Sequence, residues 1–319
     1  MDESAQSPAS GPAPGPAAEQ SASPHPIPRA VFIGTDGLRP GWRFAIYVAA
    51  FFALRFAFSF ATRPWLPPPA HGQLPSLWAF FVDECERLAA AVIPAFALGR
   101  LENRPFGTYG LPLRGAFGKQ FWIGALWGLV AITLLLSVMR GVGAFYFGGL
   151  AQHGVRMLKF AAFWGALFLI VGLFEDFLFR GYSQFTLAQG IGFWPAALLL
   201  SATFGALHLS NPGEAWVGAL GAALIGLFFC LTLRRTGTLW FAVGMHASWD
   251  WGESFLYSVP DSGLVAPGHL LHSSFHGPRW LTGGSVGPEG SVLVFVIIAL
   301  LWVVFDRMYP AKASTPLQT

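Results

Sequence analysis

Three pairs of polar or aromatic residues, each four positions apart, lie inside apolar stretches of this sequence. The pairs are Asp176 and Arg180, Phe204 and His208, and His246 and Asp250, with Glu175 directly before the first pair. Residues four apart share one face of a helix, so the members of each pair are expected to be in contact. A charge well inside a bilayer costs about 2.5–3.5 kcal/mol on insertion scales, so these groups need partners and a function.

Glu175 is the acidic residue without an expected partner on its own helix. Asp176 and Arg180 are expected to form an ion pair, which lowers the cost of burying each charge. Glu175 points about 100° away from Asp176 around the helix axis. A carboxylate that is not held in an ion pair is free to accept a proton, so the sequence predicts Glu175 as a general base.

The two histidines allow two chemical interpretations. Phe204 is expected to contact and orient His208, and Asp250 is expected to hold His246 or to present an oxygen to the site. In the first interpretation, Glu175 and His208 polarise a water that attacks a peptide carbonyl, while His246 and Asp250 stabilise the oxyanion. In the second, Glu175, His208 and His246 hold a zinc ion whose bound water is the nucleophile. The spacing does not separate these interpretations.

The composition indicates what kind of elements position these residues. The chain of 319 residues is 54% hydrophobic and only 11% charged, and its mean hydropathy is +0.53. Soluble domains carry about 25% charged residues, so the sequence predicts an all-α, polytopic transmembrane helical bundle. No Lys/Arg-rich run with interleaved aromatics indicates nucleic-acid binding. Cys85 and Cys230 are expected to be small buried hydrophobic residues.

The bundle is predicted to contain about eight membrane helices, because eight stretches approach the length of about 20 apolar residues that a span requires. These stretches are 43–62, 78–98, 119–139, 157–178, 192–208, 215–233, 237–257 and 290–308. Acidic and basic residues between Asp83 and Arg87 interrupt the second stretch, so its helix is expected to begin later, with these charges at the membrane interface. Arg55 in the first helix is expected to snorkel toward the interface.

Four regions organise the chain. Residues 1–40 are predicted to be a disordered tail, 41–156 the N-terminal membrane helices, 157–257 the catalytic core, and 258–319 an exterior loop, the last helix and a C-terminal tail. The loop 258–289 is expected to be solvated, although its histidines allow metal binding as an alternative; these are His269, His272 and His276.

The loops also predict the orientation of the chain. Loops on the side of the two termini carry more Lys and Arg than the opposite loops, which favours cytoplasmic termini by the positive-inside rule. In a bacterium this membrane would be the inner membrane.

One conflict concerns the depth of the site. Glu175 lies toward the end of its predicted helix, whereas His208 lies at the far end of the next helix. We therefore expect the helix of Glu175 to continue past Arg180 to about Leu187. That extension would place Glu175 at mid-membrane, where it faces both histidines across a water-filled cavity.

The motifs EDxxxR, FxxxH and HxxxD, in this order and with FRGY after the acidic pair, resemble those of the CPBP family of intramembrane proteases. This family includes type II CAAX prenyl endopeptidases and abortive-infection proteins, and the resemblance covers about 159–257. It implies a hydrolase that cleaves membrane-embedded or lipid-modified protein substrates at the bilayer. The family usually has Glu at the position of Asp176.

The resemblance also implies residue roles. Glu175 would activate water with His208 as its partner, His246 and Asp250 would face the transition state or a metal, and Arg180 would support Asp176. The family has been described both as metalloproteases and as glutamate-type proteases, so the cofactor, zinc or none, stays open. The alternatives are a non-catalytic scaffold or immunity-type protein with the same fold, and a proton-coupled transporter. The transporter is disfavoured because the sequence shows no repeat symmetry.

Overall fold

The computed structural model describes residues 31–34, 37–66, 76–265 and 267–311. The chain divides into two units, Met1–Arg39 and Pro40–Thr319. In the first unit, β1 (Ile33–Gly34) pairs with β2 (Gly37–Leu38) in antiparallel fashion. Most of the predicted disordered tail, 1–40, lies outside the described residues, as does the C-terminal tail from 312.

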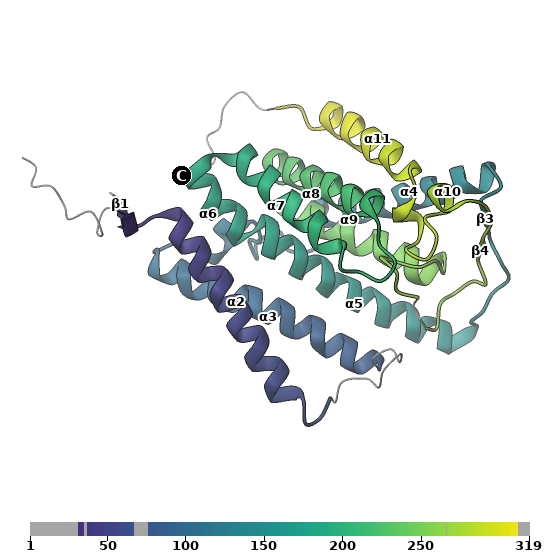
Figure 1. The fold of residues 1–319 in the computed structure, drawn as a ribbon, viewed down its shortest axis with the longest axis horizontal. Coiled ribbons are helices and arrows are strands. Elements are labelled where there is room, and N and C mark those ends of the chain that lie inside the picture. Colours follow the sequence, from purple (N-terminus) through teal and green to yellow (C-terminus); the bar gives the residue numbers. More distant parts are fainter. Residues whose placement is uncertain (1–30, 35–36, 67–75, 266, 312–319) are drawn as a thin grey trace, which may run out of the picture. The chain divides into compact units, whose positions relative to one another are not determined.

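The second unit is built from helices (Figure 1). Its α-helices are α2 (Pro40–Thr62), α3 (Leu77–Leu101), α4 (Lys119–Gly141), α5 (Gly154–Arg180), α6 (Tyr182–Ile191), α7 (Phe193–His208), α8 (Trp216–Thr236), α9 (Trp240–Trp251), α10 (Arg279–Thr282) and α11 (Leu293–Met308). Shorter elements are η1 (Phe106–Tyr109), the π-helical η2 (Gly252–Leu256), η3 (Pro288–Gly290), and the strands β3 (Phe145–Tyr146) and β4 (Ser274–Phe275), which pair with each other.

These elements confirm the all-α class, and each of the eight predicted apolar stretches is helical. Within the described residues, four helical segments are long and apolar enough to cross a membrane: α2, α4, α5 with α6, and α8. Large apolar side chains at spacings of four stay exposed on such helices, for example Phe52, Phe56 and Phe60 on α2. An exposed apolar stripe of this kind is the surface that a lipid-facing helix presents.

The charged cluster in α3 differs from the prediction. The helix begins at Leu77, capped by the side chain of Ser76, and contains the charges instead of starting after them. The two acids Asp83 and Glu86 bind Arg55 of α2 at 2.7 and 3.0 Å. Arg55 therefore forms ion pairs between helices and does not snorkel, because partners on α3 are within reach.

Close helix packing fixes α9, which carries the third motif. A Cβ at Gly244 of α9 would collide with the carbonyl oxygen of Phe121, and a Cβ at Gly128 of α4 would collide with that of Met245. The glycines thus let the backbones of α4 and α9 approach closely, as small residues do in membrane helix pairs. On the other side, Gly172 of α5 faces the backbone of Val243. Helix α9 is therefore held between α4 and α5.

The helical segment of Glu175 continues past Arg180 to Ile191, as expected, but it is interrupted at Gly181. Helix α5 ends at Arg180, and α6 begins at Tyr182 after a break at Gly181, whose ψ of −119° is not helical. A Cβ at Gly181 would collide with Phe177, so this bend requires glycine. The ten residues of α6 still advance the chain by about 15 Å before α7 begins. Helix α7 then returns past α5 and α8 (Figure 1).

Candidate active site

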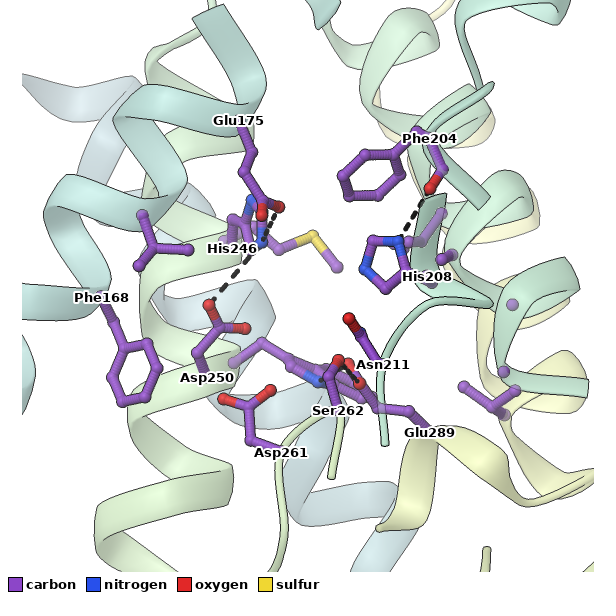
Figure 2. Close-up of a pocket in the computed structure, with 18 of the residues that line it drawn as sticks. Phe168, Glu175, Phe204, His208, Asn211, His246, Asp250, Asp261, Ser262 and Glu289 are labelled. Carbon is purple, nitrogen blue, oxygen red and sulfur yellow. Dashed lines mark hydrogen bonds and ion pairs between the residues drawn. The ribbon is translucent and has the colours of Figure 1, made fainter. Parts of the chain in front are cut away.

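The three predicted motifs meet at one cavity of about 240 Å³. Glu175 comes from α5, His208 from the last turn of α7, and His246 and Asp250 from α9. Figure 2 shows Glu175, His246 and Asp250 on one wall, with His208 on the opposite wall beside Phe204. A water in the liquid occupies about 30 Å³, so the cavity has room for several waters between these walls.

His246 is surrounded by three carboxylates. Its Nε2 lies 3.6 Å from Oε2 of Glu175 and 3.6 Å from Oδ2 of Asp250, and its Nδ1 lies 3.5 Å from Oδ2 of Asp176. These separations are longer than hydrogen bonds, and catalytic hydrogen bonds often tighten only when a substrate is bound. The contact between Asp250 and His246 was predicted from their spacing, whereas the contact with Asp176 was not.

Asp176 and Arg180 form the predicted pair, with Oδ1 and Nη1 3.3 Å apart. Both side chains are buried, Asp176 completely. The guanidinium also lies over the ring of Phe204, 4.4 Å from its centroid, in a cation–π arrangement. A Cβ at Gly226 of α8 would collide with Nη2 of Arg180, so this glycine leaves the space that the guanidinium occupies. The shorter acid, Asp176, still reaches both Arg180 and His246.

The ring of His208 is oriented by its neighbour one turn earlier, as predicted. Its Nδ1 lies 2.8 Å from the carbonyl oxygen of Phe204, and the two rings meet edge to face with centroids 4.6 Å apart. A carbonyl oxygen only accepts hydrogen bonds, so Nδ1 of His208 donates. In a neutral ring this leaves the lone pair on Nε2 free to accept a proton or a hydrogen bond from water.

Several polar residues of the cavity were not predicted from the sequence. Glu84 comes from α3, Asn211 and Glu214 follow α7, and Asp261 and Glu289 come from the segment 258–289. That segment was expected to be a solvated exterior loop, so its part in the cavity is a correction. The spacing of residues along the sequence did not indicate these cavity residues, because they are brought together from segments that lie far apart in the chain.

Two of these acids lie outside the predicted spans and have raised pKa values. Burial raises the pKa of Asp261 well above its usual range, and the nearby carboxylates of Asp250 and Glu289 act in the same direction. Burial also raises the pKa of Glu214, and Glu289 adds to this effect while the backbone N–H of Ala215 opposes it. This end of the cavity is therefore rich in closely spaced acidic groups.

The predicted zinc ligands do not form a compact donor set. Among the described residues, the group of three whose donor atoms lie within 4.8 Å of one another is Glu253, Asp261 and Glu289, and not Glu175, His208 and His246. Zinc ligands lie about 2.0–2.2 Å from the ion, so three donors must lie within about 4.5 Å of one another. Glu175, His208 and His246 in this arrangement therefore do not fit a zinc ion. The histidines of the segment 258–289 form no such group either.

The fold and the site define a class of protein: an all-helical membrane-type protein with a carboxylate–histidine cluster that lines a cavity between its helices. Residues 157–252 match the model of a family described as type II CAAX prenyl endopeptidase Rce1-like. This segment, less than a third of the chain, holds all three motifs, and over it the predicted resemblance to the CPBP family is confirmed. A search of curated proteins gave no match to the chain.

Proposed function

We propose that this protein is an intramembrane endopeptidase that hydrolyses a peptide bond in a membrane-embedded or lipid-modified protein. The single observation that supports this proposal most is the convergence of Glu175, His208 and His246 from three helices on one cavity. The family match supports protease activity of the CAAX type at the level of the family.

In the proposed reaction, a water lies between Glu175 and His208. Glu175 takes one proton from this water while Nε2 of His208 accepts a hydrogen bond from it, and the hydroxide forms a bond to the carbonyl carbon of the substrate. The carbonyl oxygen becomes an oxyanion. Glu175 then returns its proton to the leaving nitrogen as the C–N bond breaks, so the carboxylate is regenerated and one water is consumed.

His246 would stabilise the oxyanion in this reaction. Its two ring nitrogens face the carboxylate oxygens of Glu175, Asp176 and Asp250, which only accept hydrogen bonds when ionised. A ring protonated on both nitrogens suits these neighbours, and it supplies a positive charge where negative charge develops. Asp250 and Asp176 would then be positioning residues that hold the ring.

We favour metal-free chemistry over a zinc mechanism. The donor atoms of Glu175, His208 and His246 do not gather within ligand distance of one point, as described above. The partly exposed carboxylate of Glu175 and the oriented ring of His208, which line the same cavity, would supply a base without a metal. Cleavage is therefore expected to persist when a zinc-selective chelator is present.

We also propose that the chain crosses the membrane several times with both termini in the cytoplasm. The even number of helical stretches and the Lys and Arg content of the loops support this orientation. Residues 41–156, 157–257 and 258–319 would then serve as supporting helices, catalytic core and cavity-closing segment.

The proposed function is tested by cleavage of a peptide with a prenylated cysteine near its carboxyl terminus, the substrate class that the CAAX description names. The purified protein in lipid nanodiscs should release a C-terminal fragment, detected by mass spectrometry. Glu175→Gln should lower the rate by about 10²- to 10⁴-fold, the usual contribution of a general base. An unchanged unfolding midpoint controls for folding.

An unprenylated peptide of the same sequence separates lipid recognition from peptide hydrolysis. Undiminished cleavage by a correctly folded Glu175→Gln protein would refute the assigned role. The absence of cleavage of membrane-bound peptides by the wild-type protein would instead favour the non-catalytic scaffold.

A further inference from the structure

A second cluster of carboxylates lies beside the candidate active site and takes no part in the proposed reaction. Glu253 comes from the π-helical η2, Asp261 from the segment that follows it, and Glu289 from η3. One oxygen of each lies within 4.8 Å of one oxygen of the others. Two ligands of one Ca²⁺ ion, each at 2.3–2.6 Å, lie no more than about 5 Å apart, so this spacing suits a shared cation.

Glu253 distinguishes this cluster from a group of solvated acids, because its carboxylate is buried and unpaired. Its side chain is 0% exposed, and neither of its carboxylate oxygens has a hydrogen-bond partner. A buried charge is normally paired, hydrogen-bonded or bound to a metal. Within the described parts of the chain, no Lys or Arg forms an ion pair with Glu253, Asp261 or Glu289.

The other two carboxylates are held in place by neighbouring donors. The hydroxyl of Ser254 donates to Oδ2 of Asp261 at 3.0 Å, and the hydroxyl of Ser262 donates to Oε2 of Glu289 at 2.8 Å. The indole N–H of Trp249 donates to Oε1 of Glu289 at 3.2 Å. Hydrogen bonds that orient the ligands are typical of metal sites, where they fix the direction of each donor.

The backbone at Glu253 is also unusual. Helix α9 passes directly into the π-helical turn η2, and single π turns occur often at functional sites. The wider turn changes the direction of the side chains that follow Asp250. Asp250 lines the cavity of the active site, and Glu253, three residues later, lies beside Asp261 and Glu289.

We propose that Glu253, Asp261 and Glu289 form a binding site for a divalent cation that prefers oxygen ligands, with Ca²⁺ as the best fit. All three donors are carboxylates, which select hard cations over zinc. Ca²⁺ tolerates irregular geometry and takes six to eight oxygens, so waters or carbonyl groups would complete its shell. Mg²⁺ requires a near-ideal octahedron.

The ion would join the end of α9 to the segment 258–289, which lines part of the cavity. Asp261, Ser262 and Glu289 line this cavity, as Figure 2 shows. The site is therefore structural in effect; it shares this cavity with the residues assigned to hydrolysis but uses none of them as a ligand. The inference does not depend on the proposed protease activity.

The test uses the full chain in nanodiscs after treatment with a chelator. Addition of Ca²⁺ should raise the unfolding midpoint in a saturable way, because a ligand that binds only the folded state stabilises it. Tb³⁺ bound at the site should give luminescence sensitised by the adjacent Trp249, and Ca²⁺ should displace it. Mg²⁺ should act only at higher concentration.

The decisive variant is Glu253→Gln, which keeps the shape of the side chain and removes one ligand charge. It should weaken Ca²⁺ binding by about tenfold or more, since even residues behind the ligands contribute 10- to 100-fold. Asp261→Asn is a second variant in case the first does not fold. Glu175→Gln is the matched control, and it should bind Ca²⁺ as the wild type does.

Three results would overturn the proposal. The wild-type protein could show no Ca²⁺-dependent stabilisation, in which case the three carboxyl groups share protons instead of an ion. Glu253→Gln and Asp261→Asn could bind Ca²⁺ undiminished. Alternatively, Glu175→Gln could lose the binding, which would place the ion at Glu175 instead of at Glu253, Asp261 and Glu289.

Discussion

Arg180 shows how a single residue can support the site without touching a substrate. Its guanidinium is buried, with Asp176 as its ion-pair partner and the ring of Phe204 against one face. Asp176 in turn faces His246, and Phe204 holds His208. Arg180 therefore lies behind both histidines, and we expect it to fix their positions.

Replacement of Arg180 by alanine is expected to lower the free energy of unfolding by about 3–5 kcal/mol. This is the typical cost of leaving one partner of a buried ion pair uncompensated, here Asp176. Denaturant unfolding in detergent, followed by tryptophan fluorescence, measures the change.

Asp306→Ala is the matched control, because Asp306 pairs with Arg235 and its own side chain is 60% exposed. Loss of this surface pair should cost no more than about 1 kcal/mol. Equal losses in the free energy of unfolding for the two substitutions would show that the buried ion pair contributes no more to stability than the exposed one.

Residue spacing predicted some of these contacts and could not predict others. The pairs Asp176–Arg180 and Phe204–His208 are separated by one helical turn, so their contact follows from helix geometry alone. The contact of His246 with Asp176 joins two helices about 70 residues apart, and its existence depends on how α5 packs on α9. The same reason explains why Asp261 and Glu289 were not predicted.

At the scale of elements, the position of His246 depends on how closely α9 approaches its neighbours. Gly244 lies two residues before His246, and its Cα faces the backbone of Phe121 and Ala125 on α4. The apolar length of these helices predicts that they form, but it carries no information on which pairs are in contact. The bend at Gly181 was missed because the apolar pattern continues across it.

Gly244→Ala is expected to push α9 away from α4, because the new Cβ would collide with the carbonyl oxygen of Phe121. Overpacking of this kind typically costs about 1–3 kcal/mol. The shift should also move His246, so cleavage should slow even at temperatures where the variant remains folded. Unfolding and initial rates measure the two effects.

Gly141→Ala at the end of α4 provides the control, since a Cβ there meets no atom within 4 Å. Its stability should stay within about 0.5 kcal/mol of the wild type. A Gly244→Ala protein with unchanged stability and rate would show that the close approach of α4 and α9 does not position the site.

At the scale of the whole molecule, the apolar surface and the charges together predict how the chain lies in a bilayer. Exposed stripes such as Trp122, Leu126 and Val130 on α4 face outward, whereas the polar groups of the cavity face inward. This division is typical of a membrane protein with a hydrated interior. The hydropathy pattern predicts which helices present apolar side chains to the lipid. The residues that line the cavity could not be predicted in this way, because they come from five or more segments whose packing the pattern does not give.

Both termini are expected on the cytoplasmic side. In sealed inside-out vesicles, tags at the N- and C-termini should both be removed by added protease, whereas both should be protected in right-side-out vesicles. Removal of only one tag in each preparation would show an odd number of crossings and would contradict the proposed arrangement.

The proposed mechanism requires that Glu175 and His208, from separate helices, activate the same water. The most direct test is a double-mutant cycle on the cleavage rate, with Glu175→Gln, His208→Ala and the combined variant. Residues that act as a unit are strongly non-additive. We predict that the double variant is no slower than the slower single variant. Rate losses that multiply in the double variant, or a single variant that cleaves at the wild-type rate, would contradict the proposed mechanism.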